Sequence, residues 1–170
     1  MRYSVLSTIN ITCFCAAFTR ADWPSFRGPG NQAHANAGSY PLKWSPKENI
    51  GWKVKLPGLG ASSPVIYGES VFVTCFTGTK GPDIVRHLLC FDRQSGKQLW
   101  EQKRAALQPE SDYTGQHQQH GFATATPFVD GERIYVNYCR GGVFAFDLNG
   151  KELWHRELGK FRNSFGSASS

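Results

Sequence analysis

The chain has 170 residues, a formal net charge of +6, and a composition that is 40% hydrophobic and 14% aromatic, with 18 glycines and a single methionine. Short runs of Val, Ile, Phe, Tyr and Trp between Gly and Pro are typical of many-stranded antiparallel proteins, and no long stretch has helical periodicity. The basic residues are scattered and form no stripe, which argues against a nucleic-acid partner.

Residues 1–21 have the features of a signal peptide. Arg2 gives a positive start, a moderately apolar segment follows, and small residues lie near position 21. The segment is too short and too polar for a transmembrane span, and the rest of the sequence offers no other candidate. Neither Cys13 nor Cys15 lies in a lipid-attachment motif. We therefore predict an exported protein, periplasmic or extracellular, that begins with an irregular segment over 22–48.

The sequence repeats itself. Residues 60–73 match 123–136, and residues 90–100 match 145–154, where both copies contain Phe-Asp, Gly-Lys and Leu-Trp pairs. Residues 165–170 begin the first phrase again and stop before its proline. Tandem repeats of this length are typical of solenoids and propellers, in which each unit buries its apolar faces against its neighbours.

Each unit divides into four short strands. For the second unit the expected strands are 123–129, 132–139, 143–148 and 151–158. Asp-Gly and Asn-Gly pairs at two of its turns suit tight hairpins. The repeats occupy 49–170, with units over 61–103 and 123–158. Residues 49–56 align with the fourth strand of each unit, so the array should open on a lone strand, which in closed propellers completes the last blade.

The predicted fold is all-β: an incomplete β-propeller of four-stranded antiparallel blades, with about two blades, a lone N-terminal strand and the start of a third. Such a piece would leave apolar blade faces and open sheet edges exposed. We therefore expect a truncated product whose partners are the missing blades or further copies of itself.

The two Phe-Asp to Leu-Trp segments resemble the tryptophan-docking motif of the pyrrolo-quinoline-quinone-like (PQQ-like, or quinoprotein-like) β-propeller repeat family, although the second copy is one residue shorter at its turn. The resemblance implies that Asp, Gly and Trp fix the corner between the third and fourth strands and pack each blade on the next, in a parent of about eight blades. Residues 22–30 are similar to the N-terminus of secreted members from planctomycete-type bacteria. The residues to which the docking role is carried over are Trp52, Asp92, Gly96, Trp100, Asp147, Gly150 and Trp154.

Two long insertions should meet at one end of the blades. Residues 77–86 join the second and third strands of the first unit, and residues 104–121 join its fourth strand to the next unit. Both connections lie at the same end of a blade, opposite the tight turns. Function concentrates on long loops carried by a rigid scaffold, and in the quinoprotein relatives this is the cofactor-facing side.

The second insertion holds weak metal-ligand candidates, Asp112, His117 and His120. Two histidines three apart on a helical turn, with a carboxylate nearby, are a possible transition-metal motif. A third strong ligand is lacking, so we expect a solvated or packing loop and no metal site. The sequence has no nucleophile elbow, P-loop, dinucleotide fingerprint or paired-carboxylate motif, so no residue is assigned a catalytic role and cofactor-binding residues stay unknown.

Three cysteines follow the predicted leader: Cys75, Cys90 and Cys139. An odd number cannot all pair within the chain. Cys75 and Cys90 should lie on adjacent strands, where a disulfide is one alternative and buried thiols are the favoured one.

Three functions stay open. The leading hypothesis is an exported, non-catalytic scaffold or binding module with a protein partner in the cell envelope. The first alternative is the N-terminal part of a PQQ- and calcium-dependent dehydrogenase, in which a full-length relative would bind both cofactors. The second alternative is an adaptor for outer-membrane β-barrel assembly, which the missing lipid-attachment motif disfavours.

Overall fold

The computed structural model describes residues 21–35, 37–38, 40–60, 62–106, 109–115 and 117–158. The predicted start of a third unit, 165–170, and the predicted leader apart from Ala21 lie outside this part of the chain. The first sheet consists of β1 (Val65–Tyr67), β2 (Ser70–Thr77), β3 (Val85–Asp92) and β4 (Gln98–Ala105). The second sheet consists of β5 (Phe128–Val129), β6 (Arg133–Asn137), β7 (Val143–Asp147) and β8 (Glu152–Arg156).

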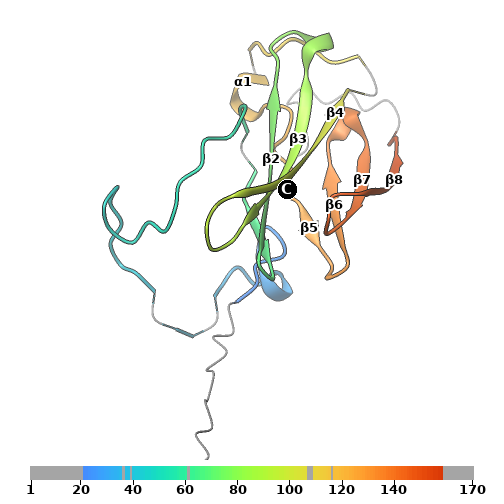
Figure 1. Ribbon diagram of the computed structural model, residues 1–170. Coiled ribbons are helices and arrows are strands. Elements are labelled where there is room, and N and C mark those ends of the chain that lie inside the picture. Colours follow the sequence, from blue (N-terminus) through green and yellow to red (C-terminus); the bar gives the residue numbers. More distant parts are fainter. Residues whose placement is uncertain are drawn as a thin grey trace, which may run out of the picture.

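Both predicted blades are confirmed. Each sheet is antiparallel, with its four strands in sequence order, and the two sheets lie side by side (Figure 1). The first strand of the second blade is shorter than expected, because β5 covers only Phe128–Val129 instead of 123–129. The carbonyls of Ala123 and Ala125 instead accept hydrogen bonds from the Thr74 hydroxyl of the first blade, at 3.2 and 3.3 Å. This stretch therefore joins the blades rather than extending its own sheet.

The segment predicted as a lone strand over 49–56 pairs with no other strand among the described residues. The segment is extended, but no backbone hydrogen bond between described residues involves 50–56. A strand requires a neighbour to satisfy its N–H and C=O groups, and this segment has none within the described part of the chain. In Figure 1 residues 40–58 run along the side of the first blade that faces away from the second.

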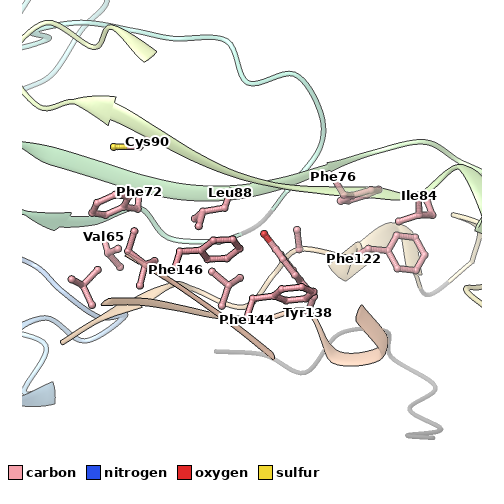
Figure 2. Packing of buried hydrophobic residues seen from close by; sticks show 14 residues of the cluster. Val65, Phe72, Phe76, Ile84, Leu88, Cys90, Phe122, Tyr138, Phe144 and Phe146 are labelled. Atoms are coloured by element: carbon pink, nitrogen blue, oxygen red, sulfur yellow. The ribbon is translucent and has the colours of Figure 1, made fainter. Parts of the chain in front are cut away.

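The main core lies between the blades. Side chains from β2 and β3 face side chains from β6 and β7 across this interface, as Figure 2 shows for Phe72 and Leu88 opposite Phe144 and Phe146. All four are at most 2% exposed. Because most of the largest buried side chains belong to this shared cluster, each blade depends on the other for its apolar burial.

Corresponding rows of residues cross the two sheets. In the first blade, the row of paired residues is Val65, Phe72, Cys90 and Trp100. In the second blade, the matching row is Phe128, Tyr135, Ala145 and Trp154. The first row packs against the second blade, whereas Phe128 and Trp154 of the second row are 47% and 38% exposed. The two repeats therefore pair their strands in the same register, but Phe128 and Trp154 of the second blade are more exposed than the matching residues of the first blade.

Residues 22–30 connect the inner strands of both blades. Trp23 exchanges two backbone hydrogen bonds with Ile66 of β1, at 2.8 and 2.9 Å, and the Pro24 carbonyl accepts one from Val129 of β5 at 2.9 Å. Gly28 lies against the Trp23 ring, where a Cβ would come within 2.7 Å of three ring atoms. The segment is irregular, and these backbone hydrogen bonds hold it at the end of the blades opposite α1 (His117–His120) (Figure 1).

No helix among the described residues is long and apolar enough to span a membrane.

Candidate functional site

An aspartate shapes the corner between the third and fourth strands of each blade. The Asp92 carboxylate accepts hydrogen bonds from the backbone N–H and the hydroxyl of Ser95, at 2.7 and 2.5 Å. The Asp147 carboxylate accepts two from the backbone N–H groups of Asn149 and Lys151, at 2.9 and 2.8 Å. Side-chain capping of this kind fixes a tight turn, and it positions the glycine that follows.

A tryptophan of the preceding segment covers each corner glycine. A Cβ on Gly96 would lie 2.6 Å from the Trp52 ring, and one on Gly150 would lie 2.8 Å from the Trp100 ring. The Trp52 indole donates to the Arg93 carbonyl at 2.9 Å, and the Trp100 indole donates to Leu148 at 3.2 Å. The two contacts therefore share one geometry.

Trp154 has no such corner to cover among the described residues. Its ring lies 6.1 Å from that of Tyr135 and is 38% exposed. Trp154 occupies the same register position as Trp100, opposite a small residue, Ala145 in place of Cys90. In the second blade, the row of Phe128, Tyr135, Ala145 and Trp154 therefore has the same register as the row of Val65, Phe72, Cys90 and Trp100 in the first blade, which packs against the second blade.

The two insertions meet at one end of the blades, as predicted. The Asp112 carboxylate accepts a hydrogen bond from the Gly81 backbone N–H at 2.9 Å and pairs with the Lys80 ammonium at 3.1 Å. The Tyr113 N–H donates to the Thr79 carbonyl at 2.8 Å. Gly81 begins the 3₁₀ helix Gly81–Asp83 in the first insertion. We call the surface formed by residues 78–84 and 109–115 the loop face.

The Gly81 N–H and, after it, the Lys80 ammonium hold the pKa of Asp112 below its ordinary value. Both groups stabilise the charged carboxylate, which therefore acts as a clamp between the insertions rather than as a free acid.

A buried ion pair lies beneath the loop face. Arg86 of β3 and Glu110 of the second insertion pair directly, with side chains 1% and 4% exposed. The Arg86 Nε also donates to the Phe122 carbonyl at 3.0 Å, and its guanidinium lies 5.9 Å from the ring centres of Phe122 and Tyr138. The pair thus links a strand of the first blade, the insertion and the face of the second blade.

Arg86 was not identified from the sequence, although a signal was present. The period of two that places Leu88 and Cys90 in the interblade core also places Arg86 there, since successive side chains of a strand alternate between its faces. A charged residue on an inward position predicts a buried partner. What the sequence cannot supply is the partner, because Glu110 lies in an irregular segment 24 positions away.

The structure does not bring the metal-ligand candidates together. His117 lies at the start of α1, as the helical spacing suggested, but its ring stacks on Phe122 at 5.5 Å. Asp112 is held by Lys80 and Gly81, and the side chain of His120 is not among those described. Within the described residues, no three His, Cys, Asp or Glu side chains gather in a way that would hold a metal.

A second polar cluster lies on the opposite face of the first blade. His87 of β3, 3% exposed, contacts the Thr77 hydroxyl through Nε2 at 2.9 Å and the Glu101 carboxylate through Nδ1 at 2.6 Å. Burial would raise the pKa of Glu101, but the hydrogen bond with His87 and the nearby Lys103 together lower it. Both ring nitrogens of His87 are engaged, which fits a satisfied interior histidine.

The cysteines are thiols in the described structure. Cys75 packs with Val71 and Val73 on one face of the first blade, whereas Cys90 packs in the interblade core on the other, so the two cannot bridge. Burial raises the pKa of each thiol to about 11, which makes both poor nucleophiles. The favoured interpretation of buried thiols is confirmed for these two residues.

A family model described as outer membrane protein assembly factor BamB, built on PQQ-like repeats, matches residues 44–168. Among solved structures, the crystal structure of BamB from Moraxella catarrhalis aligns over 63% of this chain with 20% identity and a TM-score of 0.41. The chain covers 26% of that protein's length. A comparison with curated proteins gives no significant match. Because the family match spans most of the chain, the protein belongs to the BamB-like family of PQQ-repeat β-propellers.

Proposed function

We propose that this chain is part of an exported, non-catalytic propeller scaffold whose loop face binds a protein partner in the cell envelope. The observation that carries the proposal is the clamp between the insertions, in which Asp112 joins Lys80 and Gly81 and Tyr113 joins Thr79. A surface whose shape is fixed before binding loses less conformational entropy when a partner docks. Export rests on the signal-peptide features of residues 1–21.

The chain's own carboxylates do not favour the dehydrogenase alternative. Calcium is held by several oxygen ligands, usually including free carboxylates. Of the carboxylates on and beneath the loop face, Asp112 is occupied by Lys80 and Gly81 and Glu110 is occupied by Arg86, which leaves Asp83 exposed. These residues do not fit a calcium or quinone site, so we derive no chemistry through either group.

A second candidate is an adaptor in outer-membrane protein assembly, and the family match over 44–168 favours it. In that role the loop face would contact the periplasmic part of a membrane barrel protein. The absence of a lipid-attachment motif at Cys13 and Cys15 counts against it.

Site-specific photo-crosslinking tests the proposal. A photoreactive residue at Thr114, exposed on the loop face, should crosslink to the partner, and the same residue at Asn149, exposed at the opposite end of the second blade, should not. The purified periplasmic domain of the organism's outer-membrane assembly barrel is the first partner to try. Equal crosslinking from both positions would contradict the loop face as the docking surface. Saturable binding of pyrrolo-quinoline quinone with calcium would favour the dehydrogenase instead.

A further inference from the structure

Residues 42–55 form a basic segment that projects from the first blade (Figure 1). The segment contains one acidic residue, Glu48, and four exposed lysines: Lys43, Lys47, Lys53 and Lys55. Among the described residues, none of these lysines has an ion-pair partner. The segment therefore presents an excess of uncompensated positive charge to its surroundings.

Large apolar side chains alternate with the lysines. Leu42, Trp44 and Ile50 are 92%, 62% and 50% exposed. A hollow with a volume of about 400 Å³ is lined by Trp44 and Ile50, and the Lys53 side chain also belongs to its lining. Exposed apolar side chains around a hollow of this size mark a surface that another molecule covers.

Hydrogen bonds hold the segment in this shape. Ser45 and Glu48 exchange two backbone hydrogen bonds, at 3.2 and 3.1 Å. The Asn49 side chain donates to the Lys43 carbonyl at 2.9 Å. The indole of Trp52 joins the segment to the first blade through its hydrogen bond to the corner between β3 and β4. The exposed side chains are thus carried on an ordered loop, which loses little conformational entropy when it docks.

We propose that residues 42–55 dock onto an anionic lipid surface, with Trp44 and Ile50 in the headgroup region and the lysines against lipid phosphates. Tryptophan favours the boundary between membrane and water, because its ring is apolar and its N–H is polar. Each lysine close to an anionic leaflet adds electrostatic attraction. A lysine stem lies along apolar surface while its ammonium stays in water. Exposed apolar and basic side chains on one segment are the combination that interfacial binding requires.

The lysines distinguish this segment from a surface that protein covers. The cores of protein interfaces are depleted in lysine, and the interblade cluster, as the described residues form it, contains none. A twofold contact with a second copy would place the lysines of one chain against those of the other. An anionic lipid surface supplies both the negative charge and the apolar depth. The segment shares no residue with the loop face, so this inference and the proposed function can fail separately.

Binding to lipid vesicles tests the proposal on the 170-residue chain. Vesicles of phosphatidylcholine with phosphatidylglycerol as the anionic lipid are compared with vesicles of phosphatidylcholine alone. We expect saturable binding to the anionic vesicles, which weakens as salt is added. Residues 1–21 contain no tryptophan, so tryptophan emission reports only the rest of the chain. Brominated acyl chains should quench this emission, and Trp44→Phe should remove most of the quenching.

Paired charge variants separate this segment from the general attraction between a basic chain and an anionic surface. Lys43→Gln with Lys47→Gln should weaken vesicle binding about 25-fold, at about fivefold per lysine. The matched control is Lys97→Gln with Lys151→Gln, at exposed lysines that follow the corner turns of the two blades, and it should weaken binding less than about twofold. All four side chains are exposed, so the thermal unfolding midpoint should stay the same in both variants.

Three results would overturn the proposal. The first is equal binding to anionic and neutral vesicles, and the second is an equal loss of affinity in the two pairs of lysine variants. The third is a chain that sediments with vesicles while brominated lipid leaves Trp44 unquenched. Dimers that form without lipid and that Trp44→Ala disrupts would assign the segment to a second copy instead.

Discussion

At the scale of single residues, a corner glycine must both adopt a left-handed backbone conformation and leave room for a neighbouring tryptophan ring. Gly150 has φ of +85°, a conformation that side-chain-bearing residues avoid, and its α-carbon lies against the Trp100 ring. Gly68, in the hairpin between β1 and β2, has φ of +55° but no atom within 4 Å of the place where a Cβ would be. A substitution at Gly68 therefore reports backbone strain alone, whereas one at Gly150 also reports packing against Trp100.

We predict that Gly150→Ala lowers the free energy of unfolding by roughly 2–4 kcal/mol, the sum of left-handed backbone strain and a clash with Trp100. Gly68→Ala should cost only the strain, about 1 kcal/mol. Urea denaturation monitored by tryptophan fluorescence measures both. Equal losses in the two variants would mean that Trp100 does not press on the corner.

The Asp112 clamp should depend on pH. Because the pKa of Asp112 is lowered in the folded chain, its carboxylate contributes stability that is present above its ordinary pKa of 3.8 and is lost as pH falls through the lower folded value. We expect Asp112→Asn to be less stable than the natural chain at neutral pH, with the difference shrinking at acidic pH. Asp83→Asn is the control, because Asp83 is an exposed carboxylate on the 3₁₀ helix that begins at Gly81, the residue whose N–H donates to Asp112. A difference that does not vary with pH would show that the clamp is not electrostatic.

At the scale of elements, the Arg86–Glu110 pair ties strand β3 to an insertion that has little regular structure of its own. Both side chains are almost fully buried, so each partner neutralises the other's charge, which would otherwise be buried without a counter-charge. The pair also brings the insertion against the second blade, where the Arg140 side chain donates to the Pro109 carbonyl at 3.3 Å. The insertion is therefore positioned by Arg86 of the first blade and by Arg140 of the second, in the 3₁₀ helix Cys139–Gly141.

A double-mutant cycle tests this coupling. We predict that Arg86→Met and Glu110→Leu each cost about 3–5 kcal/mol, because each leaves one buried charge or polar site uncompensated, and that the double variant costs less than the sum of the two. Urea denaturation of the four chains gives the coupling energy. The exposed Lys80–Asp112 pair is the comparison, and its coupling should be much smaller. Additive losses at Arg86 and Glu110 would contradict the assignment of a coupled pair.

Elements were predictable from the sequence where the repeat supplied two copies to compare. The four strands of each unit, their tight turns and the meeting of the two insertions all follow from alternation and turn chemistry. For the segment 49–56, strand propensity is local and says nothing of a neighbour, so the sequence alone does not show that the segment stays unpaired among the described residues. The Arg86–Glu110 pair escaped notice because its two ends have no regular spacing between them.

At the scale of the whole molecule, the interblade cluster makes two sheets into one folding unit. The shared core combines Phe72 and Leu88 of the first blade with Phe144 and Phe146 of the second (Figure 2), and it also includes Ile134 of β6. The Arg104 guanidinium adds a second link, lying 5.2 Å from the Phe146 ring centre and donating to Glu152 at 2.9 Å through Nε. Because most of the largest buried side chains lie in this shared cluster, each sheet is expected to depend on the other for stability, as is usual in repeat proteins.

We therefore predict that the two blades unfold together. Ile134→Ala in β6 removes buried side-chain volume from the shared cluster and should cost about 3 kcal/mol. If the blades form one cooperative unit, this change speeds amide exchange at Leu88 of the first blade as much as it does in the second, because both exchange through global unfolding. Leu153→Ala, at a 44% exposed position of β8, is the control and should change stability by less than about 0.5 kcal/mol. Faster exchange confined to β5–β8 would mean that the first blade holds together without its neighbour.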